Sequence, residues 1–138
     1  GAFGVLSMVL LILFKFILLI SMENLPIAIV LSFANSRLVV GRIISYKKTA
    51  KVDGLGSIFH NSNPKNLIII STIIYITILF LLDGRYIIPL VITFLAGEYI
   101  TYISYKKIGG LTGDVYGAII ELGDVISLLV FWGVMIWI

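Results

Sequence analysis

The sequence has no cysteine, one histidine and few charged residues, and each scarcity excludes a class of structure or site. Without cysteine, these residues form no disulfide and no thiolate metal site. The single histidine, His60, has no second metal-ligating residue at a suitable spacing, so we interpret it as an ordinary loop residue. Charged residues make up 12% of the chain, against about 25% in soluble domains. With 60% hydrophobic residues and a mean hydropathy of +1.15, this composition indicates an integral membrane protein.

Five long apolar segments account for most of the chain: residues 2–21, 25–45, 67–82, 86–105 and 114–138. Each is long enough to cross a bilayer about 30 Å thick as a helix, although the third is short. The sequence therefore predicts an all-α fold, a polytopic transmembrane bundle of about five helices that forms one domain over residues 1–138. Because an apolar run is under way by Phe3 and no initiator Met is present, we interpret the chain as a piece of a longer protein.

The connections between these segments differ in charge. Tight turns at residues 22–24 and 83–85 alternate with a polar loop at 46–66 and a short basic connection at 106–113. Eight of the ten Lys and Arg lie at or near the second pair: Arg37, Arg42, Lys47, Lys48, Lys51, Lys65, Lys106 and Lys107. The positive-inside rule makes that face cytoplasmic, so the last segment begins at the cytoplasmic surface. The same positive charge would equally suit a site that binds phosphate groups.

Three acids recur in the last segment: Asp114, Glu121 and Asp124. At about 100° per residue they fall within roughly an 80° arc of a helix. Ionised acids inside a transmembrane segment are costly and usually functional, so we expect this stripe to face a protein or water-filled interior. A capped helix start at Thr112, Gly113 and Asp114 explains the first acid and leaves the two deeper ones unexplained.

Three further features of the sequence suggest ligand contacts or pairing. Backbone N–H groups at a helix start after Gly109 and Gly110 can receive phosphate oxygens, and nearby carboxylates can hold Mg²⁺. Glu98 shares a helix face with Thr101, Tyr102 and Tyr105, and is either a ligand-binding acid or a hydrogen-bonded packing residue. Lys15 lies near the end of the first segment, so we expect it to snorkel to the interface rather than pair with an acid.

Three blocks of the sequence together resemble the adenosylcobinamide-GDP ribazoletransferase family, also called cobalamin synthase. They are the opening GAFGV before a long apolar stretch with a lysine, Gly41-Arg42 followed by Asp53-Gly54-Leu55-Gly56-Ser57-Ile58-Phe59, and GGLTGDVYGAIIELGDVISLL from Gly109. Their order and spacing agree over essentially all 138 residues. The resemblance implies a Mg²⁺-dependent transferase of the prokaryotic cell membrane that acts late in cobalamin biosynthesis. It would join adenosylcobinamide-GDP to α-ribazole or its 5′-phosphate and release GMP.

The resemblance also implies roles for individual residues. Asp114 would lie closest to the metal or diphosphate, Glu121 would orient the nucleophile, and Asp124 would be a secondary metal ligand. The matched positions Gly109, Gly110, Thr112 and Gly113 would bind substrate. From their place on the basic face we add Arg42, Lys47 and Lys48 as candidate phosphate contacts, and we keep Glu98 as a candidate substrate-binding acid. No nucleic acid is expected as a partner, and whether several copies associate is left open.

The chain departs from the family in one respect. Family members carry, before GAFGV, an aspartate-rich motif of the form DGxxDxxDG that looks like the metal site of CDP-alcohol phosphotransferases, and these residues contain no equivalent. We therefore expect a carboxy-terminal half or somewhat more of the enzyme, inactive without the preceding part. Two other classes remain open: a transporter or ion-translocating subunit that uses Glu98, Glu121 and Asp124 as a relay, and a structural membrane subunit.

Overall fold

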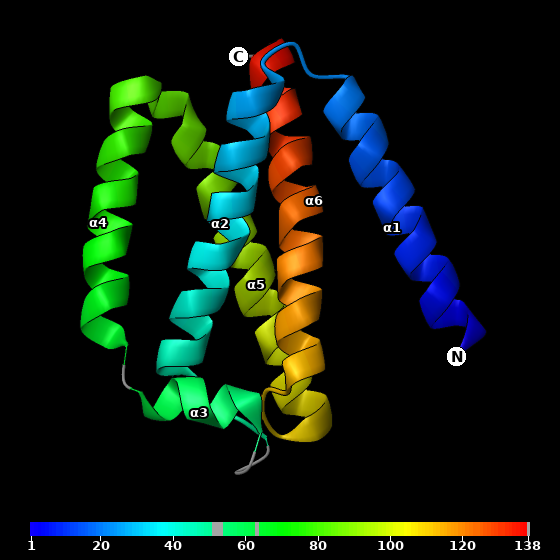
Figure 1. Ribbon diagram of the computed structural model, residues 1–138, viewed down its shortest axis with the longest axis vertical. Helices are drawn as coiled ribbons and strands as arrows, with labels where there is room; N and C mark the ends of the chain where they lie inside the picture. The colour runs from blue at the N-terminus through cyan, green and yellow to red at the C-terminus, as the bar shows by residue number, and fades with distance from the viewer. Residues whose placement is uncertain (51–53, 63, 138) are drawn as a thin grey trace.

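The computed structural model describes residues 1–50, 54–62 and 64–137 and is helical throughout most of them. Its elements in chain order are α1 (Ala2–Ile20), α2 (Leu25–Tyr46), α3 (Leu55–Asn61), α4 (Lys65–Leu82), the 3₁₀ turn η1 (Gly84–Tyr86), α5 (Ile87–Ile108) and α6 (Gly113–Trp137) (Figure 1). All of the α-helices except the short α3 are long and apolar enough to cross a membrane. The five predicted spans are thus confirmed, with boundaries that differ by at most three residues.

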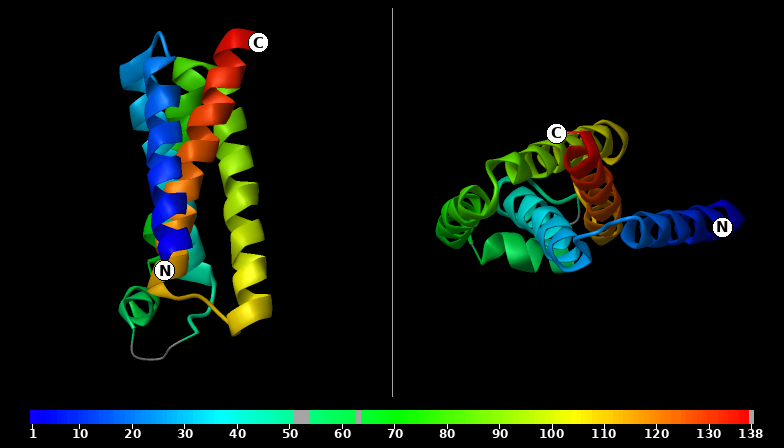
Figure 2. Two further views of the ribbon diagram at one scale, coloured as in Figure 1. Left: turned by 90° about the vertical axis from the view of Figure 1, so that its right-hand side faces the viewer. Right: turned by 90° about the horizontal axis from the view of Figure 1, so that it is seen from above.

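Helices α2, α5 and α6 form the centre of the bundle, with α1 on one side and α4 on the other (Figure 2). Glycines let the central helices approach closely. A Cβ added at Gly97 of α5 would lie 2.5 Å from Val39 Cγ1 of α2. One at Gly123 of α6 would lie 3.0 Å from Ser36 Cβ, also of α2. Small residues at such contacts are typical of helix packing in lipid, where close van der Waals contact drives association.

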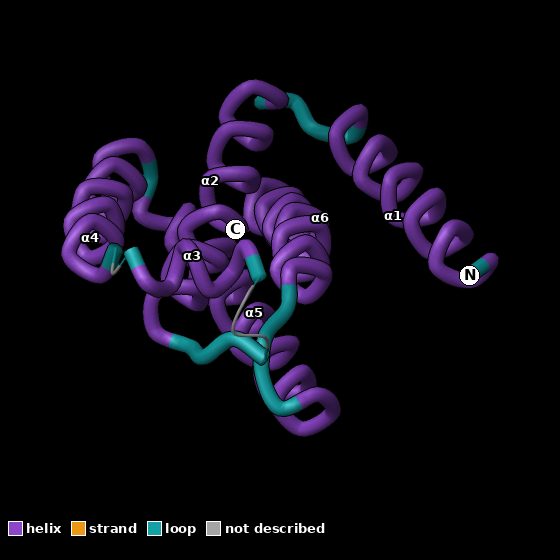
Figure 3. Tube along the Cα trace, turned by 60° about the horizontal axis from the view of Figure 1, so that its bottom comes forward, coloured by secondary structure: helices purple, strands orange, loops and turns teal. Residues whose placement is uncertain are grey.

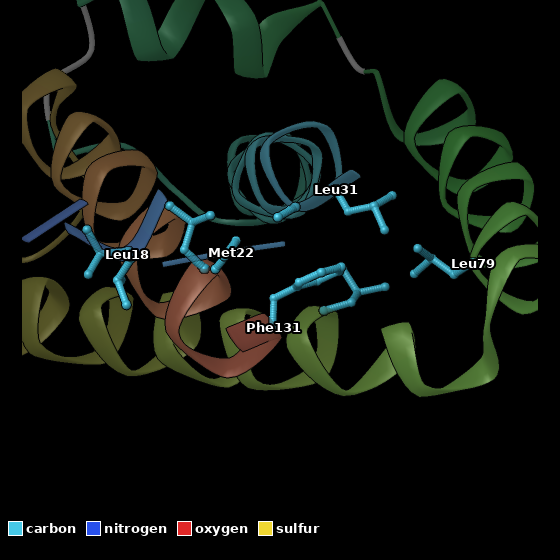
Figure 4. Packing of buried hydrophobic residues seen from close by; sticks show 9 residues of the cluster. Leu18, Met22, Leu31, Leu79 and Phe131 are labelled. Carbon is cyan, nitrogen blue, oxygen red and sulfur yellow. The ribbon is translucent and has the colours of Figure 1, made fainter. Parts of the chain in front are cut away.

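Two apolar clusters fill the bundle, one toward each end. The first joins Leu18 and Met22 near the end of α1 to Leu31, Leu79 and Phe131 (Figure 4). The second consists of residues from α2, α6 and the connection before α6: Val39, Val40, Ile43, Leu111, Tyr116 and Ile119. The first cluster therefore reaches the outer helices α1 and α4, while the second stays at the centre.

A buried polar contact links α4 to the centre of the bundle. Tyr75 Oη donates to Asn35 Oδ1 at 2.7 Å, and Asn35 Nδ2 donates to Ser127 Oγ at 2.8 Å. Each such bond between membrane helices contributes about 0.6 kcal/mol on average. The chain of bonds fixes the register of α4 against α2 and α6.

The predicted polar loop at 46–66 contains a helix that the sequence pattern did not indicate. Helix α3 lies across one end of the bundle, next to the end of α2 (Figure 1, Figure 3). His60, predicted to be a loop residue, belongs to α3, and its Nδ1 donates to the carbonyl oxygen of Ile44 at 2.8 Å. A helix of seven residues is unstable in isolation, so this tertiary contact decides its formation.

The connections separate into two ends. The described residues among 46–66 (46–50, 54–62 and 64–66) and residues 106–113 lie at one end, here called the basic end, and the turns at 21–24 and 83–86 lie at the other (Figure 1). At the far end, Arg85 Nη2 lies 2.6 Å from Asp83 Oδ2, and the Arg85 backbone N–H donates to Asp83 Oδ1. These bonds lower the pKa of Asp83 below its usual range, because they stabilise the carboxylate.

Candidate functional site

A cavity of about 580 Å³ separates the basic-end halves of α1 and α6. The two helices approach each other near the end of α1 and diverge toward its N-terminus (Figure 1). Asp114, Gly117 and Glu121 line the cavity from α6, and Gly4, Ser7, Met8 and Leu11 line it from α1. Asp114 is exposed and Glu121 half-buried along this space, so an interior position for these two acids stays a prediction. We call this space the acid cavity.

Lys15 lies at the level where α1 meets α6, and it pairs with both deeper acids. Its Nζ lies 2.9 Å from Glu121 Oε2 and 3.1 Å from Asp124 Oδ2. The Lys15 side chain is 16% exposed, so the expectation that it snorkels to the interface was wrong. Because α1 packs on α6 here, the two carboxylates are closer partners for the ammonium than water beyond the helix end.

Asp124 is buried, with 1% of its surface exposed, and it binds groups from two other helices. Its Oδ1 accepts from Ser36 Oγ and from Arg37 Nη1 of α2, while its Oδ2 faces Lys15 of α1. A buried carboxylate is tolerated where cations and hydroxyl groups satisfy it. Asp124 thus ties α1, α2 and α6 together. Two cations hold Asp124, and Glu98 lines a separate cavity. This arrangement does not support an ion relay through Glu98, Glu121 and Asp124.

The partners Ser36 and Arg37 were not identified from the sequence as parts of this site. The depth of Arg37 in its segment could have indicated this role. Arg37 lies nine residues before the end of α2, about 14 Å along the helix axis. That depth is too great for simple snorkelling and indicates a buried partner.

The backbone conformation and packing of this fold explain both glycines in the connection before α6. Gly109 ends α5 in the left-handed conformation with φ 76°, which favours glycine. Gly110 packs against the chain after α2, where an added Cβ would lie 2.7 Å from the backbone nitrogen of Ala50. The Ala50 N–H donates to the carbonyl of Leu111 at 2.8 Å, which joins the two segments. Helix α6 then starts at Gly113, which lines the acid cavity, and Thr112 accepts the first-turn bond from Tyr116 N.

A second cavity, of about 560 Å³, lies at the basic end between α2 and α5, and we call it the tyrosine cavity. It is lined by Tyr46, Lys47, Lys48, Glu98, Thr101, Tyr102 and Tyr105. The predicted α5 face from Glu98 to Tyr105 is therefore a single wall. Glu98 Oε2 lies 3.0 Å from Lys47 Nζ, and Tyr105 Oη donates to the Lys48 carbonyl at 2.9 Å.

The structure distributes the predicted site residues over three places. Asp114 and Glu121 line the acid cavity, and Lys47, Lys48 and Glu98 line the tyrosine cavity. Arg42 lines a third cavity, between α2, α4 and α5. Contacts of Leu111 with the backbone of Lys48 and Ala50 join the start of α6 to the tyrosine cavity. Asp53 of the middle motif and the side chains of Leu55 and Phe59 lie outside the described residues.

Residues 1–132 match the model of the cobalamin-5-phosphate synthase family. The chain belongs to this family. It is 37% identical to an adenosylcobinamide-GDP ribazoletransferase of Clostridium botulinum strain 657, over 94% of this chain and 54% of that protein. A protein of the same name from Clostridium tetani is 31% identical, over 95% of this chain and 54% of its own length. The chain thus spans about half the length of the curated relatives it matches. No solved structure matches it at a significant level.

Membership of the cobalamin-5-phosphate synthase family raises the question of whether these residues fit Mg²⁺. The described residues contain no group of three or more His, Asp or Glu that could hold a metal. Asp114 and Glu121 lie two turns apart, about 10 Å along α6, whereas two oxygens on one Mg²⁺ lie within about 4 Å. Asp114 has no side-chain partner in the described part of the chain and fits as a single carboxylate ligand. Asp124 fits poorly, because both of its oxygens already bind cations.

Proposed function

We propose that the protein to which this chain belongs joins adenosylcobinamide-GDP to α-ribazole or its 5′-phosphate and releases GMP, a late step of cobalamin biosynthesis. The observation that carries the proposal is the family match over residues 1–132, together with relatives named adenosylcobinamide-GDP ribazoletransferase over 94% of the chain. The five membrane spans agree with an enzyme embedded in the cell membrane.

Within this proposal the acid cavity is the part of the reaction centre that these residues supply. Asp114 stands at the basic end of α6 without a side-chain partner in the described chain, so it is free to bind Mg²⁺ or to approach a metal-bound diphosphate. When bound, Mg²⁺ would neutralise charge on the diphosphate. Glu121 orients the nucleophile, while its 2.9 Å ion pair with Lys15 fixes its position.

The tyrosine cavity supplies the cationic side of the same proposal. Lys47 and Lys48 lie beside the segment that pairs with Leu111, immediately before α6. We infer that they contact substrate phosphate, with Glu98 holding Lys47 in place. The residues that line both cavities belong to the basic-end parts of their helices, and the positive-inside rule assigns this end to the cytoplasm, where nucleotide substrates occur.

We further propose that these 138 residues are inactive alone, because the described residues offer Asp114 as a single well-placed metal ligand. The test is Mg²⁺-dependent release of GMP from adenosylcobinamide-GDP with α-ribazole added. Membranes with the full-length protein should release GMP, and membranes with residues 1–138 should not. Release by neither preparation, from folded protein, would contradict the proposed reaction, and release by the fragment would contradict the missing metal ligands.

The role of Asp114 is tested in the full-length protein with Asp114→Asn. We expect turnover to fall by roughly 100-fold or more, because charge stabilisation at a reacting phosphate contributes on this scale. The matched control is Asp83→Asn, which makes the same change in the turn at the far end of the bundle. Wild-type turnover and Mg²⁺ dependence in Asp114→Asn would remove this residue from the mechanism.

A further inference from the structure

The third cavity, here called the α2–α4–α5 cavity, is apolar along its length and has one charged residue at its edge. Its volume is about 220 Å³, and Leu38, Ile76, Leu90 and Val91 are among its lining residues. Arg42 of α2, Thr72 of α4 and Phe94 of α5 also belong to the lining. An apolar cavity of about 150 Å³ holds a benzene molecule, so this one has room for a stretch of hydrocarbon.

The position of α4 places this cavity beside the lipid. Helix α4 stands at the outside of the bundle (Figure 2), and within its described span Leu79 is the one residue that is buried. All three helices around the cavity are membrane spans. From Ile87 to Phe94 the α5 wall extends about 10 Å along the helix axis. The cavity therefore lies at the outer side of the described bundle, between helices of membrane-spanning length.

Among the described residues, Arg42 is a cation that has no carboxylate partner. Its guanidinium carbon lies 4.2 Å from the centre of the Phe94 ring, while the side chain is exposed. Arg37, Lys47 and Arg85 each pair with an acid, but Arg42 forms no ion pair with any described residue. Stacking occupies the face of the guanidinium plane and leaves its N–H edge available for a phosphate.

The depth of Arg42 matches a lipid head group. It lies four residues before the end of α2, about 6 Å along the axis, whereas Ile76 and Leu90 lie deeper in the membrane. Lys65, whose Nζ lies 5.5 Å from the Tyr46 ring, adds positive charge at the same end. Basic pockets between membrane helices on the positively charged side bind the head groups of anionic lipids.

We propose that the α2–α4–α5 cavity binds an anionic phospholipid, with one acyl chain along Ile76 and Leu90 and the phosphate on Arg42. This assigns Arg42 a ligand other than the substrate phosphate expected from the sequence, because Arg42 lines neither the acid cavity nor the tyrosine cavity. Charge complementarity favours this occupant, because the lining combines apolar side chains and the hydroxyl of Thr72 with a guanidinium that pairs with no described acid, and no lining residue is acidic.

The test measures which lipids stay bound to the full-length protein after purification from vesicles of equal parts phosphatidylglycerol and phosphatidylcholine with the same acyl chains. Mass spectrometry of the retained lipid should show enrichment of phosphatidylglycerol. Arg42→Gln should lower that enrichment roughly fivefold, since one cation near an anionic surface contributes on this scale. Lys107→Gln removes an exposed cation at the same end that does not line the cavity, and should leave the enrichment unchanged.

A second variant tests the acyl-chain part of the site. Ile76→Trp should fill the cavity and reduce retention of both lipids while Arg42 remains in place. Equal retention of the two lipids by the wild type, or unchanged enrichment in Arg42→Gln, would overturn the proposal. A rise in the KM for adenosylcobinamide-GDP in Arg42→Gln, with lipid enrichment intact, would instead assign Arg42 to the substrate phosphate.

Discussion

At the scale of single residues, Lys15 illustrates how one partly buried cation sets the position of a helix. Helix α1 is exposed along most of its length, and Leu18 is its one buried residue within the described span. Lys15 supplies the polar attachment, through Glu121 and Asp124 on α6. It also lies 5.6 Å from the centre of the Phe33 ring of α2, which favours the same position. The placement of α1 therefore depends on this contact as well as on apolar packing.

We predict that Lys15→Met lowers the free energy of unfolding in mixed micelles by about 3 kcal/mol. The reason is that the buried Asp124 would lose one of its two cations and keep Arg37, while the partly exposed Glu121 would lose its ion-pair partner. Lys107→Met, at an exposed position, is the control and should be neutral. A further Glu121→Gln change in Lys15→Met should recover part of the loss. Equal stability of Lys15→Met and the wild type would show that the ion pairs contribute nothing to folding.

At the scale of elements, the bundle consists of a close-packed centre and two outer helices. Helices α2, α5 and α6 meet where Gly97 and Gly123 remove side chains from the contact. The outer helices α1 and α4 each bury one residue of their described spans. The acid cavity and the α2–α4–α5 cavity lie where an outer helix meets the centre, whereas the tyrosine cavity lies between the central helices α2 and α5.

We predict that Gly97→Ala destabilises the bundle by about 1–3 kcal/mol, because the new Cβ would lie 2.5 Å from Val39 Cγ1 and 3.3 Å from Ile43 Cδ1. Gly133→Ala in α6 is the matched control, since its Cβ would meet nothing within 4 Å. The control should be neutral or more stable by up to about 1 kcal/mol, from helix propensity. The measurement is the free energy of unfolding in mixed micelles, and a Gly97→Ala variant as stable as the control would contradict the close contact.

At the scale of the whole molecule, the alternation of turns and basic connections gives the bundle two chemically different ends. The acid cavity and the tyrosine cavity lie toward the basic end, and so does Arg42. The far end carries the Asp83–Arg85 turn and the turn at Glu23. Both proposals therefore depend on the same orientation, with the basic end in the cytoplasm.

We predict that single cysteines will report this orientation, in a cysteine-free form of the full-length protein. A membrane-impermeant maleimide should label Glu23→Cys in intact cells and should label Lys107→Cys after permeabilisation, because the two positions lie at opposite ends of the bundle. The reverse pattern would place the basic end outside the cell. It would exclude a reaction centre supplied with cytoplasmic nucleotides.

The sequence by itself determined the class of fold and the positions of the spans. Long apolar segments satisfy their backbone groups internally and must be helices in lipid, so composition and length suffice for this prediction. Sequence spacing likewise placed Glu98, Thr101, Tyr102 and Tyr105 on one wall, because a helix fixes which neighbours share a face. The family match was also present in the sequence.

The tertiary structure decided which helix meets which, and with it the partners of the charged residues. Glu121 and Asp124 could be placed on one face of α6, but the cations that face them come from α1 and α2, more than 80 residues away. The same holds for α3, which depends on His60 reaching Ile44, and for Arg42, which packs against Phe94 in a cavity of its own. Helical periodicity acts within a segment, whereas contacts between segments depend on packing that no local pattern encodes.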